Sequence, residues 1–152
     1  MDAEHVRAVA KALEEMGGFI TGLGLAFEDF GPEGECYRMS IGERHTGAPS
    51  VAHGGSVMAL MDTALGLHAL AIAATRGGAT STIEMKVNSL RPAPAGVELR
   101  TRTEVQVTGH SWVVVSGQAV DTEAGHRVAY AVGTFNIYTR GPIAAQLRAA
   151  LA

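Results

Sequence analysis

The sequence predicts an α+β domain in which an antiparallel sheet curls around one central helix. Two observations lead to this fold class. A long apolar segment over residues 52–74 begins with His53-Gly54-Gly55 and ends before Gly77-Gly78. If it forms a helix, its own apolar side chains cover nearly every face, as in a helix buried within a fold. Strand-like segments follow it, and their connections are too short for parallel crossovers. At 152 residues the chain is long enough for a single domain, residues 1–152.

The chain before this segment divides into three parts. Apolar residues recur at helical spacing until Gly17-Gly18 ends the helix; they are Val6, Val9, Ala10, Leu13 and Met16. Residues 19–30 are apolar and glycine-rich, which favours an extended segment with a loop. Residues 35–41 alternate polar and apolar side chains as a strand does, whereas residues 42–52 contain Gly47, Pro49 and polar residues typical of an ordered loop.

The second half of the chain predicts a β-meander and a final helix. Strands are expected at residues 80–90, 97–108, 111–121 and 127–138, with Pro- or Gly-containing turns between them. The last two strands are apolar on both faces, whereas a half-solvated antiparallel sheet alternates cleanly. One face can cover the central helix and the other needs a partner, for which another subunit is a candidate. Residues 143–151 are expected to form an amphipathic helix.

Composition excludes several classes of function. The formal net charge is −3 and there is no run of Lys or Arg, which argues against a nucleic-acid or membrane-surface role. Cys36 is the only cysteine, so an intrachain disulfide and a Cys-based metal cluster are excluded. The first residues mix charged and apolar side chains, unlike a secretory signal, and Asp62 and His68 interrupt the apolar segment. We therefore expect a cytoplasmic protein whose apolar segment is a core helix rather than a membrane span.

Several short motifs together resemble a known family. The residues Ala52-His53-Gly54-Gly55 precede an acid, Asp62, and His45-Thr46 lies upstream. The strand Thr82-Ile83-Glu84-Met85 leads to Arg91-Pro92-Ala93. This combination resembles the PaaI-like, phenylacetate-pathway branch of the hotdog-fold acyl-CoA thioesterases. The resemblance implies the hotdog fold, an acyl-CoA substrate with an aryl or a short to medium aliphatic acyl group, and hydrolysis without a metal or other cofactor.

The resemblance also implies catalytic roles. The N–H of Gly55 would polarise the thioester carbonyl, Asp62 would act as general base or nucleophile, and Thr82 would help to position the attacking water. Physical chemistry is consistent with the first role, because a helix N-terminus offers unpaired N–H groups and a positive dipole end. Glycine also lets a carbonyl approach without a Cβ in the way. His53 is expected to hold the loop backbone and thereby Gly55, with an acid–base role as the alternative.

Further residues are expected to contact the substrate: Gly54, Gly47, Ser50, Met58, Arg91 and His110. Arg91 and His110 are candidates for the phosphates of coenzyme A. Gly47 departs from the family, which usually has an Asn at this position, so one side-chain amide near the carbonyl is missing; Thr46 or Ser50 would have to compensate. A structural acid is the alternative interpretation of Asp62. His45 and His53 have no Cys or acid cluster beside them, so no metal site is expected.

The spacing of Gly55 and Asp62 has a consequence for assembly. Seven residues of helix separate them by about 10 Å along the axis. One carbonyl carbon cannot have its oxyanion donor and its base that far apart, because each must come within about 3 Å. We therefore expect Gly55 of one subunit to work with Asp62 and Thr82 of another in an obligatory dimer. A tetramer built as a dimer of dimers is a separate expectation for the assembly. Two other functions stay open: a non-catalytic acyl-CoA-binding hotdog protein, and an enoyl-thioester hydratase or dehydratase.

Overall fold

The computed structural model describes residues 2–28 and 35–152; residues 29 and 30 of the expected extended segment therefore lie outside the described residues. Its helices are α1 (Ala3–Met16), α2 (Gly18–Gly22), α3 (Gly54–Ala74) and α4 (Pro142–Ala150), with a 3-10 turn η1 (Glu43–His45). Its strands are β1 (Ala26–Phe27), β2 (Glu35–Ser40), β3 (Thr46–Ala48), β4 (Val51–Ala52), β5 (Ala79–Ser89), β6 (Glu98–Thr108), β7 (Trp112–Asp121) and β8 (Arg127–Tyr138).

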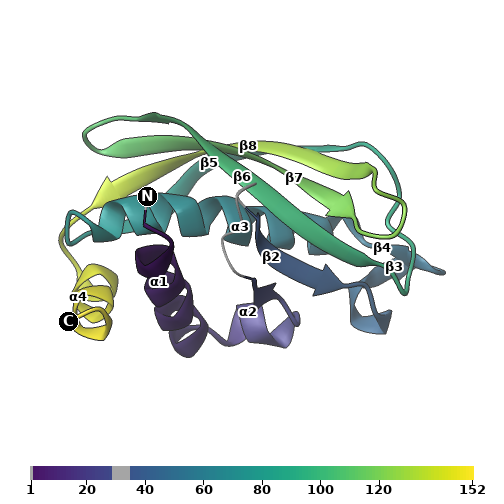
Figure 1. The fold of residues 1–152 in the computed structure, drawn as a ribbon, viewed down its shortest axis with the longest axis horizontal. Helices are drawn as coiled ribbons and strands as arrows, with labels where there is room; N and C mark the ends of the chain where they lie inside the picture. The colour runs from purple at the N-terminus through teal and green to yellow at the C-terminus, as the bar shows by residue number, and fades with distance from the viewer. Residues whose placement is uncertain (1, 29–34) are drawn as a thin grey trace.

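A six-stranded antiparallel sheet packs along α3. The strand order is β1-β2-β6-β7-β8-β5, while β3 and β4 form a separate two-stranded ribbon. Figure 1 shows strands β5 to β8 on one side of α3 and the helices α1, α2 and α4 on the other, with β2 curling around towards α2. This arrangement confirms the expected hotdog fold, in which a curled sheet encloses one long helix.

The predicted meander is wrong at its first strand. β5 pairs with β8 rather than with β6, in a register that places Thr82 opposite Phe135. The connection between β5 and β6 contains Pro92 and Pro94, and proline has no N–H for a tight hairpin. The backbone of this connection forms hydrogen bonds with other parts of the chain instead: Ala52 N–H donates to Ala93 O (2.9 Å), and Gly96 N–H donates to Ile41 O (2.8 Å). The connection therefore crosses to the other side of β7 and β8.

Helix α3 is the centre of the core. Its fully buried side chains pack against the sheet and α1; the largest are Leu60, Met61, Leu65 and Leu67. Within the described part of the chain, α3 is the one helix long and apolar enough to cross a membrane by length and composition, yet 61% of its apolar window is buried. It is therefore a core helix and not a membrane span. Asp62 is only half-buried, because its side of α3 is incompletely covered.

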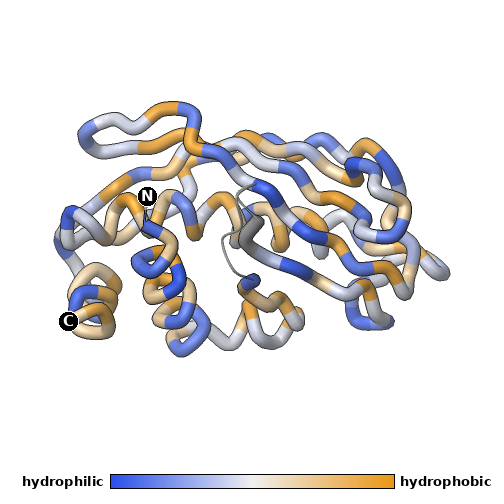
Figure 2. Tube along the Cα trace, viewed as in Figure 1, coloured by the Kyte–Doolittle hydropathy of each residue, from blue (hydrophilic) through white to orange (hydrophobic). Residues whose placement is uncertain are grey.

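The N-terminal region differs from the expectation in one place. α1 and its end at Gly17 are confirmed, but residues 18–22 form the short helix α2 instead of an extended segment. Ile20 is buried and Leu23 N–H donates to Phe19 O (3.0 Å), so packing of α2 outweighs the low helix propensity of its glycines. Figure 2 shows polar and apolar residues together on α1, as expected of a helix that buries one face.

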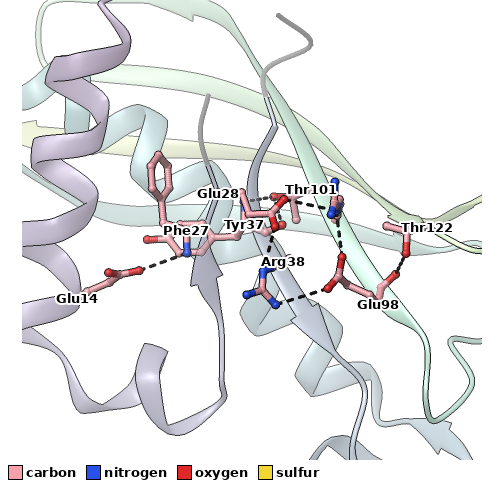
Figure 3. Close-up of polar contacts among 9 residues, drawn as sticks. Glu14, Phe27, Glu28, Tyr37, Arg38, Glu98, Thr101 and Thr122 are labelled. Atoms are coloured by element: carbon pink, nitrogen blue, oxygen red, sulfur yellow. Dashed lines mark hydrogen bonds and ion pairs between the residues drawn. The ribbon is translucent and has the colours of Figure 1, made fainter. Parts of the chain in front are cut away.

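Polar contacts fasten the edge strands to the rest of the molecule (Figure 3). Tyr37 N–H donates to Thr101 Oγ1 (2.9 Å), which joins β2 to β6. Arg38 forms ion pairs with Glu28 (3.0 Å) and Glu98 (3.5 Å) on the sheet surface. Phe27 N–H donates to a carboxylate oxygen of Glu14 on α1 (3.3 Å). The first two contacts tie the edge strands to β6, and the bond from Phe27 to Glu14 ties the edge of the sheet to α1.

Candidate active site

Asp62 and Thr82 form the polar centre of the candidate active site. Asp62 projects from the middle of α3, and Thr82 lies on β5, which returns along α3 after the turn at residues 75–78. The Thr82 hydroxyl donates to Asp62 Oδ1 at 3.0 Å. The structure therefore brings together, within one subunit, the acid and the hydroxyl that the sequence predicted to work as a pair. Asp62 is half-buried and Thr82 exposed, so water reaches both.

A pocket of about 300 Å³ opens beside this pair. It lies between the helices and the start of β5, and most of its lining is apolar. Its walls are formed by Leu13, Met16, Phe19, Ile20, Asp62, Thr63, Gly66, Leu70, Thr80, Ser81, Thr82, Phe135, Ile143 and Leu147. An apolar pocket with a few convergent polar groups is the usual form of a small-molecule site.

The N-terminus of α3 is capped by its own histidine. His53 precedes the helix in extended conformation, and its Nδ1 accepts from the N–H of Gly55 at 2.9 Å. This bond confirms that His53 holds Gly55 in place. It also means that the amide expected to polarise a carbonyl already has an acceptor in the free chain. Gly55 and Asp62 lie on the same unbroken helix, seven residues apart, which corresponds to about 10 Å along the axis.

Gly47 has no room for a side chain. A Cβ on Gly47 would lie 2.4 Å from His53 Cδ2 and 2.9 Å from His53 Cβ. The His53 ring therefore occupies the space into which a side chain at position 47 would project, which gives a physical reason for glycine there. Ser50, at the tip of the β3–β4 ribbon, has φ 65, and its carbonyl accepts from Ala95 N–H (2.9 Å).

His45 is a structural residue rather than a ligand. It is buried, its Nδ1 accepts from Gly42 N–H (2.9 Å), and its Nε2 lies 2.7 Å from Leu23 O. Its carbonyl accepts from His53 N–H (2.7 Å). The two ring nitrogens thus fasten His45 to Gly42 and Leu23, while its carbonyl holds the backbone of His53. Among the side chains that the structure describes, residues 2–28 and 37–152, no group of three or more His, Cys, Asp or Glu is placed to hold a metal ion.

The remaining predicted contacts fall at separate places. Gly54 and Arg91 line a second pocket of about 390 Å³ at the N-terminal end of α3, where Arg91 Nη1 donates to Arg127 O (3.2 Å). His110 lies at the hairpin tip near the other end of α3, and its carbonyl accepts from Arg76 Nη1 (2.9 Å). Arg91 and His110 therefore do not meet within one subunit. Met58 is 45% exposed and does not line the pocket beside Asp62.

His68 belongs to the core. It is buried between α3 and the sheet, with Nδ1 2.5 Å from Thr103 Oγ1. Desolvation by burial lowers the pKa of His68 to about 4, so the ring is neutral at pH 7. His68 is therefore a core histidine and no direct partner of Asp62.

The family of the chain follows from its sequence. Residues 50–126, half of the chain, match the model of the thioesterase superfamily. The protein belongs to the thioesterase superfamily. The matched segment includes the His53 cap, Asp62 and Thr82, so all three lie within the superfamily region. No curated protein sequence matches the chain.

Solved structures agree with this membership. The PaaI protein of Escherichia coli, from the phenylacetic acid degradation operon, is 23% identical with a TM-score of 0.77, covering 90% of this chain and 95% of that one. A mutant of the phenylacetic acid degradation protein PaaI from Thermus thermophilus is 26% identical with a TM-score of 0.67, covering 79% and 98%. The conserved protein PA5202 from Pseudomonas aeruginosa is 26% identical with a TM-score of 0.68, covering 80% and 94%. The predicted likeness to PaaI proteins is thereby confirmed.

Sequence reasoning missed the pocket walls that come from the chain ends. Met16, Phe19, Ile143 and Leu147 lie beyond the superfamily segment and meet beside Asp62 only in the fold. Their signal in the sequence was an apolar stripe on each terminal helix, which shows that a face is buried but not what it covers.

Proposed function

We propose that this superfamily member hydrolyses the thioester of an acyl-CoA to a carboxylic acid and free coenzyme A, without a metal or other cofactor, in the cytoplasm. One observation carries the proposal: the Asp62–Thr82 pair stands at the polar end of an apolar pocket in a chain of the thioesterase superfamily. A carboxylate with a hydroxyl at hydrogen-bond distance suits the activation of water, and the pocket suits an acyl group.

In the proposed reaction, Asp62 removes a proton from water held by Thr82, and the oxygen attacks the thioester carbon. The carbonyl oxygen becomes an oxyanion stabilised by the Gly55 N–H at the positive end of α3. The intermediate then collapses, the C–S bond breaks, and the thiolate of coenzyme A takes up the proton. Direct attack by Asp62, with an anhydride intermediate that water hydrolyses, is the other form of the same reaction.

We infer that the site is shared between two copies of the chain. The separation of about 10 Å between Gly55 and Asp62 prevents one helix from serving one carbonyl with both groups. Two surfaces support an assembly. Strand β5 is the last strand of the sheet and carries Ile83, which is 60% exposed beside Thr82. On the outer sheet face Trp112 and Val107 are 40% and 47% exposed, which offers a second contact for a dimer of dimers.

A thiol-release assay over a panel of acyl-CoA thioesters tests the reaction. Asp62→Asn should lower kcat by at least about a hundredfold, because it removes the group that activates water, while acyl-CoA binding is retained. Asp2→Asn is the matched control: Asp2 accepts from Glu4 N–H at the start of α1, and asparagine caps a helix equally well. Unchanged turnover in Asp62→Asn would contradict the proposal.

Mixed oligomers test the shared site. Gly55→Val, which blocks approach to the amide, and Asp62→Asn should each be inactive alone. Unfolded and refolded together, they should regain about a quarter of the native activity, because mixed dimers carry one intact site. Activity that stays absent in a verified mixed dimer, or a fully active monomer, would refute the shared site.

The same assay separates the two other functions. Acyl-CoA binding without thiol release by the native protein would indicate a non-catalytic binding protein. Hydration of crotonyl-CoA without thiol release would indicate a hydratase.

A further inference from the structure

The amide proposed to stabilise the oxyanion is covered by a neighbouring side chain. The Nδ1 atom of His53 accepts from the N–H of Gly55 at 2.9 Å. A Cβ built on Gly55 would lie 2.9 Å from Nδ1 and 3.3 Å from Cε1 of the same ring. The ring therefore lies over both the N–H and the Cα of Gly55, in the space that a glycine leaves free of its own side chain.

Two further amides of the first turn of α3 donate to backbone. Ser56 N–H and Val57 N–H both donate to His53 O, at 2.9 and 3.5 Å. The first amides of a helix have no backbone partner one turn earlier, so Gly55 depends on a side chain or a ligand for its acceptor. In the free chain the imidazole of His53 is that acceptor. A bound carbonyl and the ring therefore compete for one N–H.

The backbone of His53 is fixed more firmly than its ring. His53 N–H donates to His45 O at 2.7 Å, and His53 O accepts from the first turn of α3. Within the described part of the chain, the ring has one hydrogen bond, the one to Gly55, and His53 is exposed. Rotation about the side-chain bonds therefore moves the ring away from Gly55 while the backbone keeps its contacts.

Gly47 determines whether the ring fits in the position over Gly55. A Cβ at position 47 would lie 2.4 Å from Cδ2 and 3.0 Å from Cγ of His53, both atoms of the ring. It would also lie 2.9 Å from the Cβ of His53, which requires a small shift of the loop. Carbon atoms pack at about 3.5–4.0 Å. A side chain at position 47 therefore excludes the ring from the place that it occupies.

We propose that Gly47 is a positioning residue that acts through His53: it leaves the space in which the ring occupies the N–H of Gly55, so that a substrate carbonyl must displace the ring. This inference rests on the proposed thioesterase function, in which Gly55 stabilises the oxyanion. The ring is then a self-inhibiting cap, and moving it off Gly55 speeds the reaction. One intramolecular hydrogen bond of ordinary strength opposes its displacement by a factor of about five.

The kinetics of Gly47→Ala are the first test. With the thioester that the native protein hydrolyses fastest, we expect kcat/KM to rise about fivefold, whereas a packing defect alone would lower it. Gly42→Ala is the matched control: it lies in the same loop, and its Cβ would lie 3.8 Å from His45 Nδ1, an ordinary contact. Its kcat/KM should equal the native value. An unchanged or lower kcat/KM in a folded Gly47→Ala protein would overturn the proposal.

A second background shows whether Gly47 acts through the ring. In His53→Ala the imidazole is absent and the N–H of Gly55 is already free of it. Adding Gly47→Ala to His53→Ala should therefore give no further rise in kcat/KM. A rise of the same size in both backgrounds would show that Gly47 acts by a route other than His53, and the proposal would be wrong.

Hydrogen exchange separates this inference from the proposed reaction. Exchange of the Gly55 N–H with deuterium is followed by NMR without substrate. It should be about fivefold faster in Gly47→Ala and in His53→Ala than in the native protein and in Gly42→Ala. Equal exchange in all four proteins would refute the inference even if acyl-CoA is hydrolysed. Faster exchange in the first two variants, with no hydrolysis of any acyl-CoA, would refute the reaction and support the control of the amide by Gly47.

Discussion

The Nδ1 atom of His53 accepts a hydrogen bond from the N–H of Gly55 at 2.9 Å. Because Gly55 is the proposed oxyanion donor, a substrate carbonyl must share this N–H with His53 or displace the ring. The first turn of α3 is thus held in the free chain by the same amide that the proposed reaction would use.

Loss of this cap should destabilise the protein. We expect His53→Ala to lower the free energy of unfolding by about 1 kcal/mol, as for other helix N-caps. Asparagine carries an acceptor suited to the same N–H, so His53→Asn should recover most of the loss. Urea unfolding measures both variants. Equal stabilities of His53→Ala and the native protein would show that the bond contributes nothing.

The contact between His53 and Gly47 predicts a coupled pair. Gly47→Ala places its Cβ 2.4 Å from His53 Cδ2, a distance that forces the ring or the loop to move. We expect the free energy of unfolding to fall by about 1–3 kcal/mol, the usual cost of overpacking. The His53→Ala background removes the ring but keeps the Cβ of position 53, which would lie 2.9 Å from the new Cβ. Gly47→Ala should therefore cost less in that background than in the native protein. A double-mutant cycle by urea unfolding measures the coupling, and additive effects would contradict it.

Local sequence pattern predicted the elements of this fold but not all of their pairing. The strand expected at residues 127–138, apolar on both faces, coincides with β8. Gly17 caps α1, and Gly77-Gly78 follow the end of α3. The pairing of β5 with β8 depends on where the proline-containing connection finds its hydrogen bonds. That choice is made by tertiary contacts with Ala52 and Ile41, which alternation does not encode.

The candidate site, like the fold, was predicted from the sequence only in part. The pairing of Asp62 with Thr82 was expected from the motif resemblance, and the structure places the two side chains in contact. The bond between His53 and Gly55 depends on the side-chain rotamer of His53, which sequence does not reveal. Pocket residues such as Ile143 were missed because an amphipathic stripe does not say which groove it covers.

Burial of His68 predicts a dependence of stability on acidity. Its pKa is lowered from 6.5 in the unfolded chain to about 4 in the fold. Between these values the unfolded chain binds more protons than the folded chain, so the free energy of unfolding falls as the pH is lowered from 6.5 towards 4. Above pH 6.5 His68 is neutral in both states, and its burial then carries no charge penalty. The loss amounts to at most about 3 kcal/mol.

Urea unfolding at several pH values measures this effect. His68→Gln keeps polar groups that can reach Thr103 but does not titrate in this range. The variant should therefore show a shallower decline between pH 6.5 and 4 than the native protein. An identical decline in both would assign the acid sensitivity to other groups.

The hydroxyl of Thr82 is expected to orient Asp62 and to hold the attacking water. Thr82→Val keeps the shape of the side chain but removes the donor that lies 3.0 Å from Asp62 Oδ1. We expect kcat to fall roughly tenfold or more with little change in KM, because a positioned hydroxyl contributes mainly in the transition state. Thr82→Ser retains the hydroxyl and should keep most of the activity, and thermal unfolding checks that both variants are folded. Equal loss in the serine and valine variants would mean that the methyl group, and so packing of β5 against α3, accounts for the effect.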